Sequence, residues 1–411
     1  MPTKIDDCKI TVKNPSKDKD IFNVNSLPDD LFVSAGEKAP NRVGFSKYAS
    51  YINTISINKY GRPLVIAMSA DLADSTNISG FAKKYGSSED MGLYDKTNNT
   101  NSPLMPQGIT EFTNSGMLAG LATVNFNEDP YKEFNGYYGA MSTYGSFSYL
   151  KYGPIRLFSQ IAQDSDLKVG KLIWVAGHSG PETAEDSRTH FGIFAPGVTQ
   201  LFPDGHIINL HPWEHNEVAP ALAAAMSTDV PIVALHLTRP PITIPDRKVL
   251  GMAPHKEASK GAYIIKDYDK NRPLEGVVIV RGTSSTNSLV SILPKIINEG
   301  PNVKIVAAIS WGLFMAQNKE YRETIISENE WMDAMIITNG AIRLMHKWIA
   351  NRVVEDYSMS PDFDNQWRTG GSLDEIIAES KLDSKSIWNG IIKFTSERVK
   401  RLNALRISIP K

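Results

Sequence analysis

The sequence predicts an α/β protein of two open domains, each built on a parallel or mixed sheet. Short apolar runs bounded by turn residues recur along the chain, as buried parallel strands require. Stretches with helical periodicity separate these runs, which is the pattern of βα units. A proline-rich segment with few periodic apolar positions, residues 239–261, divides the chain into two such series.

The composition narrows the class of protein. Of the 411 residues, 41% are hydrophobic and 22% are charged, as in globular proteins of two or three domains. The net charge of -1 gives no strong attraction to nucleic acid or to an anionic membrane. No apolar run is long enough to span a membrane, and the N-terminus lacks the apolar core of a signal peptide. Cys8 is the only cysteine, so no internal disulfide can form and we expect a cytoplasmic protein.

The first series of elements is expected within a domain over residues 36–240. The polar, Lys/Asp-rich residues 1–35 before it are expected to form an extension that packs on a partner. The expected strands are 63–68, 171–176 and 231–237, and the expected helices are 113–124 and 216–226.

The second series is expected in a domain over residues 263–411, after a linker at 241–262. Ser372 with Glu375 three residues later predicts a helix start with a capping box. The other expected elements are strands at 276–280 and 303–309 and helices at 285–300 and 384–405.

Polar residues follow all three expected strands of the first domain. Because the carboxyl ends of parallel strands meet at one edge of a sheet, we expect these residues to converge on a pocket. A single histidine in a loop usually lies in solvent or caps a helix. Here, however, polar residues follow each of three strands, which favours a shared pocket. The residues are Asp71 and Ser75 after the first strand, His178, Asp186 and His190 after the second, and Arg239 after the third.

Two further motifs have a structural alternative. His211 and His215 in HPWEH have the spacing of a metal pair on a helix, but Pro212 interrupts the turn and no third ligand is evident. Packing at a helix start is therefore preferred, and no metal site is predicted in this chain. The segment RGTSS, residues 281–285, has the pattern of an anion site at a helix N-terminus, but a plain Ser/Thr cap is preferred.

Glu111 stands at the head of a helix rich in alanine and glycine. Close packing is expected to bury its carboxylate, which then needs a partner. The alternative is a surface charge at a helix N-terminus. The stretch STYGSFSYLKYG, residues 142–153, carries four aromatic residues. A core junction between a strand and a helix is the preferred interpretation, and a stacking wall for a flat heterocycle is the alternative.

These segments resemble the C-terminal half of transketolases, the thiamine-diphosphate enzymes that move two-carbon ketol units between sugar phosphates. The resemblance covers residues from about 40 to about 400 and implies a pyrimidine-binding domain followed by a transketolase C-terminal-like domain. The segments that carry it are GITEFTNSGMLA, SADLADSTN, GHSGPETAEDSRTH, HLTR, GVVIVRGTSSTNSLVSILPKI and IVAAISWGLFMAQNKEYRETII.

The resemblance also implies a role for each candidate residue. Glu111 would hydrogen-bond a ring nitrogen of the cofactor's aminopyrimidine, and Asp71 would lie near the cofactor across a subunit interface. His190 would contact the sugar and shuttle a proton, and Asp186 would accept a hydrogen bond from a substrate hydroxyl. The aromatic wall of the pyrimidine would be Phe147, Tyr149 and Tyr152, and the groups that grip the substrate phosphate would be His178, Arg239, Lys47 and Ser75.

One part of the transketolase pattern is missing. That family binds the diphosphate and its metal through Gly-Asp-Gly and a downstream asparagine, whereas the only Asp-Gly here is in FPDGHI. The insertion at 125–141 is a further departure. We therefore expect the C-terminal subunit of a split transketolase. A separate N-terminal subunit would supply the diphosphate site with its Mg²⁺ or Ca²⁺, as an α2β2 assembly.

Two alternatives stay open. The chain resembles subunits of 2-oxo acid dehydrogenases and other thiamine-dependent synthases more weakly, but the His-Asp-His loop and HLTR favour sugar phosphates. A non-catalytic homologue is the other alternative. It predicts the loss of Glu111 or of the aromatic residues, and both are present.

Overall fold

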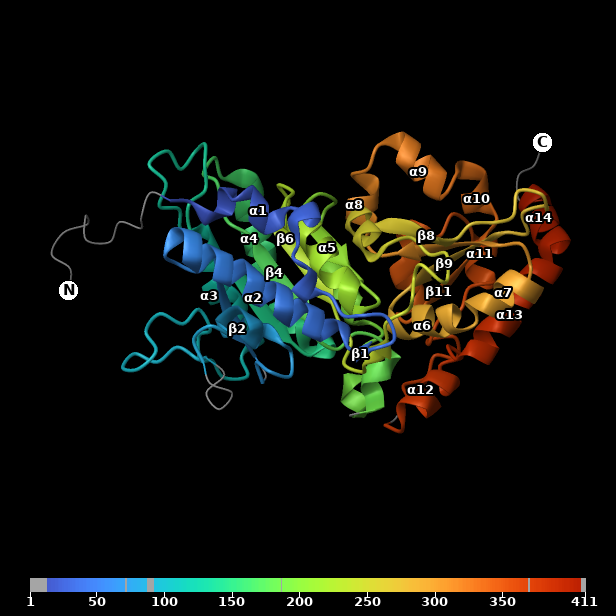
Figure 1. The fold of residues 1–411 in the computed structure, drawn as a ribbon, viewed down its shortest axis with the longest axis horizontal. Coiled ribbons are helices and arrows are strands. Elements are labelled where there is room, and N and C mark those ends of the chain that lie inside the picture. Colours follow the sequence, from blue (N-terminus) through green and yellow to red (C-terminus); the bar gives the residue numbers. More distant parts are fainter. Residues whose placement is uncertain (1–12, 71, 87–91, 186, 369, 408–411) are drawn as a thin grey trace.

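The computed structural model describes residues 13–70, 72–86, 92–185, 187–368 and 370–407. Figure 1 shows two layered α/β units side by side along the long axis of the molecule, one from each half of the chain. Each unit contains its own sheet with helices against it, which confirms the predicted fold class.

The first sheet has five parallel strands in the order β2-β3-β4-β6-β5. Three of them are the expected strands. Parallel strands need crossover connections, and helices supply several of these. The strands are β2 (Val65–Ser69), β3 (Tyr138–Thr143), β4 (Leu172–Ala176), β5 (Ile207–Leu210) and β6 (Ile232–His236).

Both faces of this sheet are covered. The helices are α2 (Asn41–Tyr60) and α5 (His215–Met226) on one face, with α3 (Glu111–Thr123) and α4 (Tyr152–Asp164) on the other. Successive side chains of a strand point to opposite faces, so in β4 Ile173 and Leu172 enter different core clusters. This two-sided burial explains why the strands read as continuous apolar runs.

β3 lies inside the sheet between β2 and β4, and only its end, in the expected strand–helix junction at 142–153, was predicted. Its sequence, YGAMST, is rich in small residues and has little β-propensity. Gly139 shows why small residues are needed in this strand. A Cβ at this position would lie 2.9 Å from side-chain atoms of both Leu118 and Leu172. Close packing of α3 on the sheet decides this strand, and the local sequence does not reveal it.

The second sheet has the order β11-β9-β10-β8, with β8 antiparallel at one edge. It is therefore mixed, as predicted. A two-stranded pairing of β1 (Lys38–Ala39) with β7 (Ile242–Thr243) lies outside both sheets. The strands of the second sheet are β8 (Ala262–Lys266), β9 (Val277–Arg281), β10 (Lys304–Ala308) and β11 (Ala334–Thr338).

Two expected helices of the second domain are each split in two. The stretch 285–300 breaks into α6 (Thr283–Ser291) and α7 (Leu293–Glu299), because Pro294 cannot continue a helix and sits in the first turn of α7. The last stretch breaks at Glu397 into α13 (Ser384–Ser396) and α14 (Arg398–Ile407). The remaining helices are α8 (Trp311–Met315), α9 (Lys319–Ile325), α10 (Glu328–Met332), α11 (Arg352–Asp356) and α12 (Leu373–Glu379), which begins with the predicted capping box.

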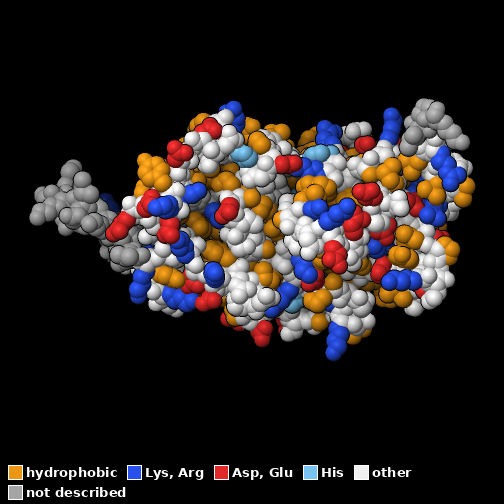
Figure 2. Space-filling view, turned by 90° about the horizontal axis from the view of Figure 1, so that it is seen from above, with side chains coloured by type: hydrophobic (Ala, Val, Ile, Leu, Met, Phe, Trp, Pro, Cys, Tyr) orange, Lys and Arg blue, Asp and Glu red, His pale blue; other side chains and the backbone are white. Residues whose placement is uncertain are grey.

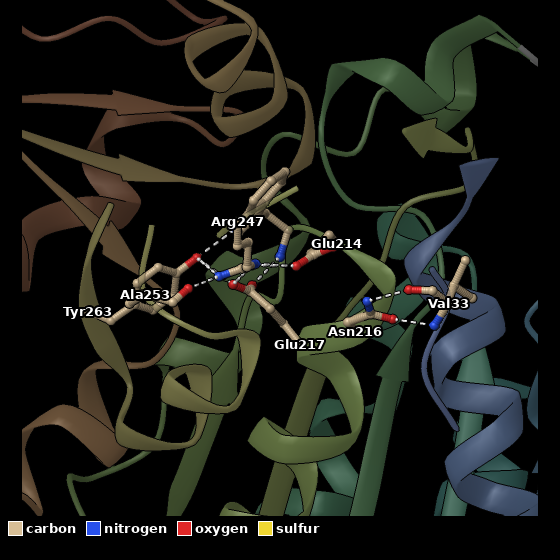
Figure 3. A network of polar contacts seen from close by, with 8 residues as sticks. Val33, Glu214, Asn216, Glu217, Arg247, Ala253 and Tyr263 are labelled. Atoms are coloured by element: carbon tan, nitrogen blue, oxygen red, sulfur yellow. Dashed lines mark hydrogen bonds and ion pairs between the residues drawn. The ribbon is translucent and has the colours of Figure 1, made fainter. Parts of the chain in front are cut away.

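The N-terminal segment packs on its own chain over residues 13–35. It contains α1 (Lys19–Phe22), whose Ile21 is fully buried with residues of α2 and α5. The backbone N–H of Val33 donates to Oδ1 of Asn216 in α5 at 2.8 Å, and Nδ2 of Asn216 donates to the carbonyl oxygen of Val33 at 2.9 Å (Figure 3). The extension therefore covers the core of the first unit.

A buried charge network ties α5 to the linker and to β8 (Figure 3). Arg247 of the linker donates to Glu214 at 2.8 Å and to Glu217 at 2.8 Å. Both carboxylates are fully buried. Tyr263 of β8 donates to Glu217 at 2.5 Å and accepts from the indole of Trp213 at 2.9 Å. One arginine thus neutralises part of the charge of two carboxylates where the two halves of the chain meet.

The surface carries charges of both signs, interspersed over the face shown in Figure 2. This mixture agrees with the net charge of -1. None of the helices in the described part of the chain combines the length and apolar character needed to cross a membrane.

Candidate functional site

The carboxyl ends of β2, β3 and β4 lie together at one edge of the first sheet, because these strands are parallel neighbours. A chain of hydroxyl groups links the loop after β2 to the end of β3. Thr76 Oγ1 lies 2.7 Å from Ser142 Oγ, which donates to Ser69 Oγ at 2.9 Å. This chain of contacts holds the loop that carries Ser75 against the sheet.

Four side chains from these three strand ends form what we call the edge cluster: Ser75, Tyr144, His178 and His190. The ring of Tyr144 lies 4.0 Å from that of His178 and 4.4 Å from that of His190, between centroids. Its hydroxyl lies 3.2 Å from Ser75 Oγ. Convergence of the predicted residues Ser75, His178 and His190 is therefore observed. Tyr144 was not predicted, although it is the first aromatic residue after β3.

A close backbone approach makes the edge cluster possible. Gly145, directly after Tyr144, runs against the carbonyl oxygen of His178, and a Cβ at this position would lie 1.9 Å from that oxygen. Glycine is required because any side chain would push the β3 and β4 loops apart. The sequence places this glycine in an aromatic stretch, where its reason is visible only in the structure.

Glu111 lies at the first position of α3 and is buried, with 7% of its surface exposed. Thr143, the last residue of β3, donates a hydrogen bond of 2.9 Å to its Oε1. No hydrogen bond to the second oxygen, Oε2, is present within the described residues. The expected partner of this carboxylate is thus partly found, and the alternative of a surface charge is wrong. One oxygen is held in place and the other is available to a ligand.

Lys151 is a second buried charge at this site. Its Nζ donates to the carbonyl oxygens of Met141 and Val175, at 3.2 and 3.1 Å. Burial lowers the pKa of Lys151 well below its usual value, and the negative charge of Glu111 opposes that shift. Lys151 therefore ties the segment after β3 to the backbone of β3 and β4. Sequence reasoning missed it because it stands among aromatic residues.

The predicted phosphate-gripping residues do not all come together. Arg239 follows β6 at the same edge of the sheet and is partly buried. Lys47 instead donates to the backbone carbonyl of Asp30, at 2.9 Å. Arg42, one helical turn earlier in α2, donates to the carbonyl oxygen of Ser75 at 2.7 Å and was not predicted. Asp71 and Asp186, the two predicted carboxylates, lie outside the described residues.

The predicted aromatic residues differ in their surroundings. Phe147 is 40% exposed on the segment that follows β3. Tyr149 donates to the carbonyl oxygen of Phe194 at 2.9 Å, and the ring of Tyr152 packs edge-on against Phe202. Phe147 is thus available to a ligand or a partner, whereas the other two contact the chain itself.

The two histidines of HPWEH contact different parts of the chain. His211 stacks on His236 with centroids 4.5 Å apart, and both ring nitrogens of His215 face backbone carbonyl oxygens. No group of three or more His, Cys, Asp and Glu side chains in the described ranges could hold a metal ion. Packing, the preferred interpretation, accounts for both histidines.

The N-terminus of α6 is occupied by a carboxylate of the first unit. Glu182, in the loop after β4, is 2% exposed and accepts hydrogen bonds from Ser284 N at 3.2 Å and Ser284 Oγ at 3.0 Å. Asn339, which follows β11, donates to it at 3.0 Å. The segment RGTSS therefore receives a carboxyl group of the chain itself, and the preferred interpretation as a plain Ser/Thr cap is wrong, because Gly282 stands at the N-cap without a side-chain cap. The same loop that carries His178 and His190 is anchored in the second unit.

The free energy of unfolding is expected to depend on pH through Glu182. Burial raises the pKa of Glu182 from 4.5 to about 7, although hydrogen bonds oppose this shift. The folded state then binds more protons than the unfolded state between these values. The contribution of Glu182 to the free energy of unfolding is fully present below pH 4.5. It is lost as the pH rises through about 7, and the loss is roughly 3 kcal/mol at most. Glu182→Gln should remove this loss, as measured by chemical denaturation across the range.

Glu185→Gln is the matched control, because Glu185 lies in the same turn and is exposed. It should unfold with the pH dependence of the unchanged protein. An unchanged slope for Glu182→Gln would contradict the assignment.

An exposed apolar face borders the site on α3, α4 and the segment between β3 and α4. Monomeric proteins rarely expose a large contiguous apolar patch, and such patches mark interaction surfaces. Phe112, the residue after Glu111, is 64% exposed and approaches Gly153. The other exposed members are Ile109, Met117, Phe147, Leu150, Leu157 and Ile161.

Comparison with known proteins gives one consistent answer. No family model matches the chain. A transketolase of Nostoc sp. is 29% identical over 270 residues, which are 64% of this chain and 34% of that protein. A transketolase structure from Leishmania mexicana matches 95% of this chain with a TM-score of 0.68 at 16% identity, and a Pichia stipitis transketolase in complex with sedoheptulose-7-phosphate matches 92% with a TM-score of 0.66 at 18% identity. The chain spans 48% of each of these two solved chains.

Proposed function

Since this chain is homologous to the C-terminal part of transketolases, we propose that it is the C-terminal subunit of a split transketolase. With a second polypeptide that carries the diphosphate-binding domain, it transfers a two-carbon ketol unit from a ketose phosphate to an aldose phosphate. The observation that carries this proposal is the buried carboxylate of Glu111. Its Oε1 is held by Thr143, which directly precedes Tyr144 of the edge cluster.

The residues present fit the pyrimidine end of thiamine diphosphate. A buried carboxylate with an available oxygen suits a protonated ring nitrogen, and the exposed ring of Phe147, on the segment after β3, suits a flat ring. When bound, the cofactor supplies the electron sink that allows the bond next to a ketose carbonyl to break. Oε2 of Glu111 would accept a hydrogen bond from the ring nitrogen and so hold the proton between the two groups. Its burial would exclude water from that contact.

The edge cluster would then handle the sugar. His190, partly exposed and packed against Tyr144, would move a proton to or from a substrate hydroxyl. Arg239, Ser75 and His178 would bind the phosphate group, with Asp186 on a substrate hydroxyl. The Pichia stipitis complex with sedoheptulose-7-phosphate supports a sugar phosphate as the substrate class.

The second polypeptide is proposed for two reasons. The 411 residues contain no Gly-Asp-Gly motif for the diphosphate and its Mg²⁺ or Ca²⁺. The exposed apolar face beside Glu111 is of the kind that a protein partner covers. An α2β2 assembly, in which each cofactor lies between this chain and its partner, satisfies both observations.

Calorimetry tests this proposal. Proteins that co-purify with this chain are identified first, and the one that carries Gly-Asp-Gly is produced separately. Thiamine diphosphate with Mg²⁺ should bind tightly to the mixture and weakly to each chain alone, because each supplies one end of the site. Ketol transfer should appear only in the mixture. Equally tight binding by this chain alone would refute the split arrangement.

A further inference from the structure

A separate cavity of about 440 Å³ lies between the two units. It sits at the carboxyl ends of β9 and β10 of the second sheet, where open α/β sheets bind ligands, and alongside β5, the edge strand of the first sheet. Its volume is within the range of small-molecule sites. None of Glu111, Ser75, Tyr144, His178 and His190 lines it, so it is distinct from the site described above.

The cavity contains a buried cation with unused hydrogen-bond donors. Arg281, the last residue of β9, is 4% exposed and lines the cavity. Its Nη1 donates to the carbonyl oxygen of Leu344 at 3.1 Å. Its Nε and Nη2 are buried without a hydrogen-bond partner among the described residues. A buried guanidinium with two unused donors is costly unless a ligand satisfies it.

The neighbouring groups leave the positive charge of Arg281 uncompensated. Burial, followed by the charge of Arg281, lowers the pKa of His211 well below its usual value and that of His236 to about 3, so both histidines are neutral. Burial lowers the pKa of Arg281 only to about 9, so it stays protonated at neutral pH. Asp204 also lines the cavity, but its side chain is 80% exposed and pairs with Lys347.

The remaining walls are largely apolar and aromatic. An apolar lining with a few charged and polar groups is typical of a site for a small organic ligand. A flat ring would find aromatic surface on more than one side. The apolar lining residues include Phe202, Ile208, Ile309, Trp311, Leu344 and Trp348.

We propose that this cavity binds a small organic anion, with a carboxylate or phosphate group on Arg281 and an apolar or aromatic body against the walls. The proposal does not depend on the transketolase function, because the cavity shares no residue with the edge cluster or Glu111. A ligand there would contact both units at once, since Asn209 belongs to the first sheet and Arg281 to the second.

Isothermal titration calorimetry of the full chain tests the proposal with three probes that share one ring: benzoate, phenyl phosphate and benzamide. At least one of the two anions should bind, and at least tenfold more tightly than neutral benzamide. Whichever anion binds more tightly identifies the head group. Arg281→Met keeps an apolar side chain at the position but removes the charge. It should weaken anion binding about tenfold to hundredfold, as expected for charged hydrogen bonds.

Arg352→Met is the matched control, since Arg352 is exposed at the start of α11 and outside the cavity. It should bind the anions as the unchanged chain does. Gly312→Leu is a second variant that fills the cavity from α8, where the first added carbon would make ordinary contact with Ile208. It should abolish binding even if Arg281→Met fails to fold. Failure of both anions to bind, equal binding of benzamide, or full affinity in either cavity variant would overturn the proposal.

Discussion

Glu111→Gln is expected to lower ketol transfer about a hundredfold to ten-thousandfold in the complex of this chain with its diphosphate-binding partner. Glutamine keeps the size of the side chain and can still accept the hydrogen bond that Thr143 donates to Oε1. It cannot hold or release a proton at the second position. The initial rate of transfer from a ketose phosphate to an aldose phosphate measures the effect. Assembly, followed by size-exclusion chromatography, should persist.

Glu128→Gln makes the same chemical change at an exposed position of the same domain and should keep full activity. Near-normal transfer by Glu111→Gln would remove this carboxylate from its proposed role. Loss of assembly in Glu111→Gln, with normal assembly of the control, would point instead to a structural role.

Arg247→Met is expected to lower the free energy of unfolding by about 3–5 kcal/mol at pH 8. Methionine fills part of the space but leaves the buried carboxylates of Glu214 and Glu217 without a counter-charge. Burial already raises the pKa of Glu214 to about 7 while Arg247 opposes that shift. The loss should therefore be smaller at acidic pH, where Glu214 takes up a proton. Denaturation with urea at both pH values measures it.

Lys248→Met is the control, because Lys248 is the exposed neighbour of Arg247 and should change the free energy of unfolding little. A variant with Arg247→Met, Glu214→Gln and Glu217→Gln together should recover much of the lost stability, since it buries no net charge. If Arg247→Met unfolds no more easily than the control at pH 8, the network in Figure 3 does not hold the linker to α5 and β8.

Much of the fold could be predicted because its signals are local. Apolar runs such as 171–176 and 231–237 identify strands buried on both faces, and Ser372 with Glu375 identifies a capped helix start. The start of β3, before the expected junction at 142–153, could not be predicted, because Gly139 is selected by the close approach of Leu118 and Leu172.

The candidate site could be predicted in part. Because the carboxyl ends of parallel strands lie at one edge of a sheet, the sequence predicted that Ser75, His178 and His190 lie close together. Tyr144 and Arg42 were missed, because an aromatic ring or a guanidinium in the sequence does not show which neighbour it contacts. The roles predicted for Lys47, Arg239 and the aromatic residues stay predictions.

From sequence alone, the alternation of apolar runs and helical stretches settled the sheet type, the division into two α/β units and the burial of the strands. These properties follow from periodicities within a few residues of each other. Contacts between the units followed only from three-dimensional packing: Glu182 at the start of α6, Arg247 between two carboxylates, and Arg281 in a cavity without a counter-charge. Such contacts join residues far apart in the chain, and they depend on how two sheets pack, which no local pattern encodes.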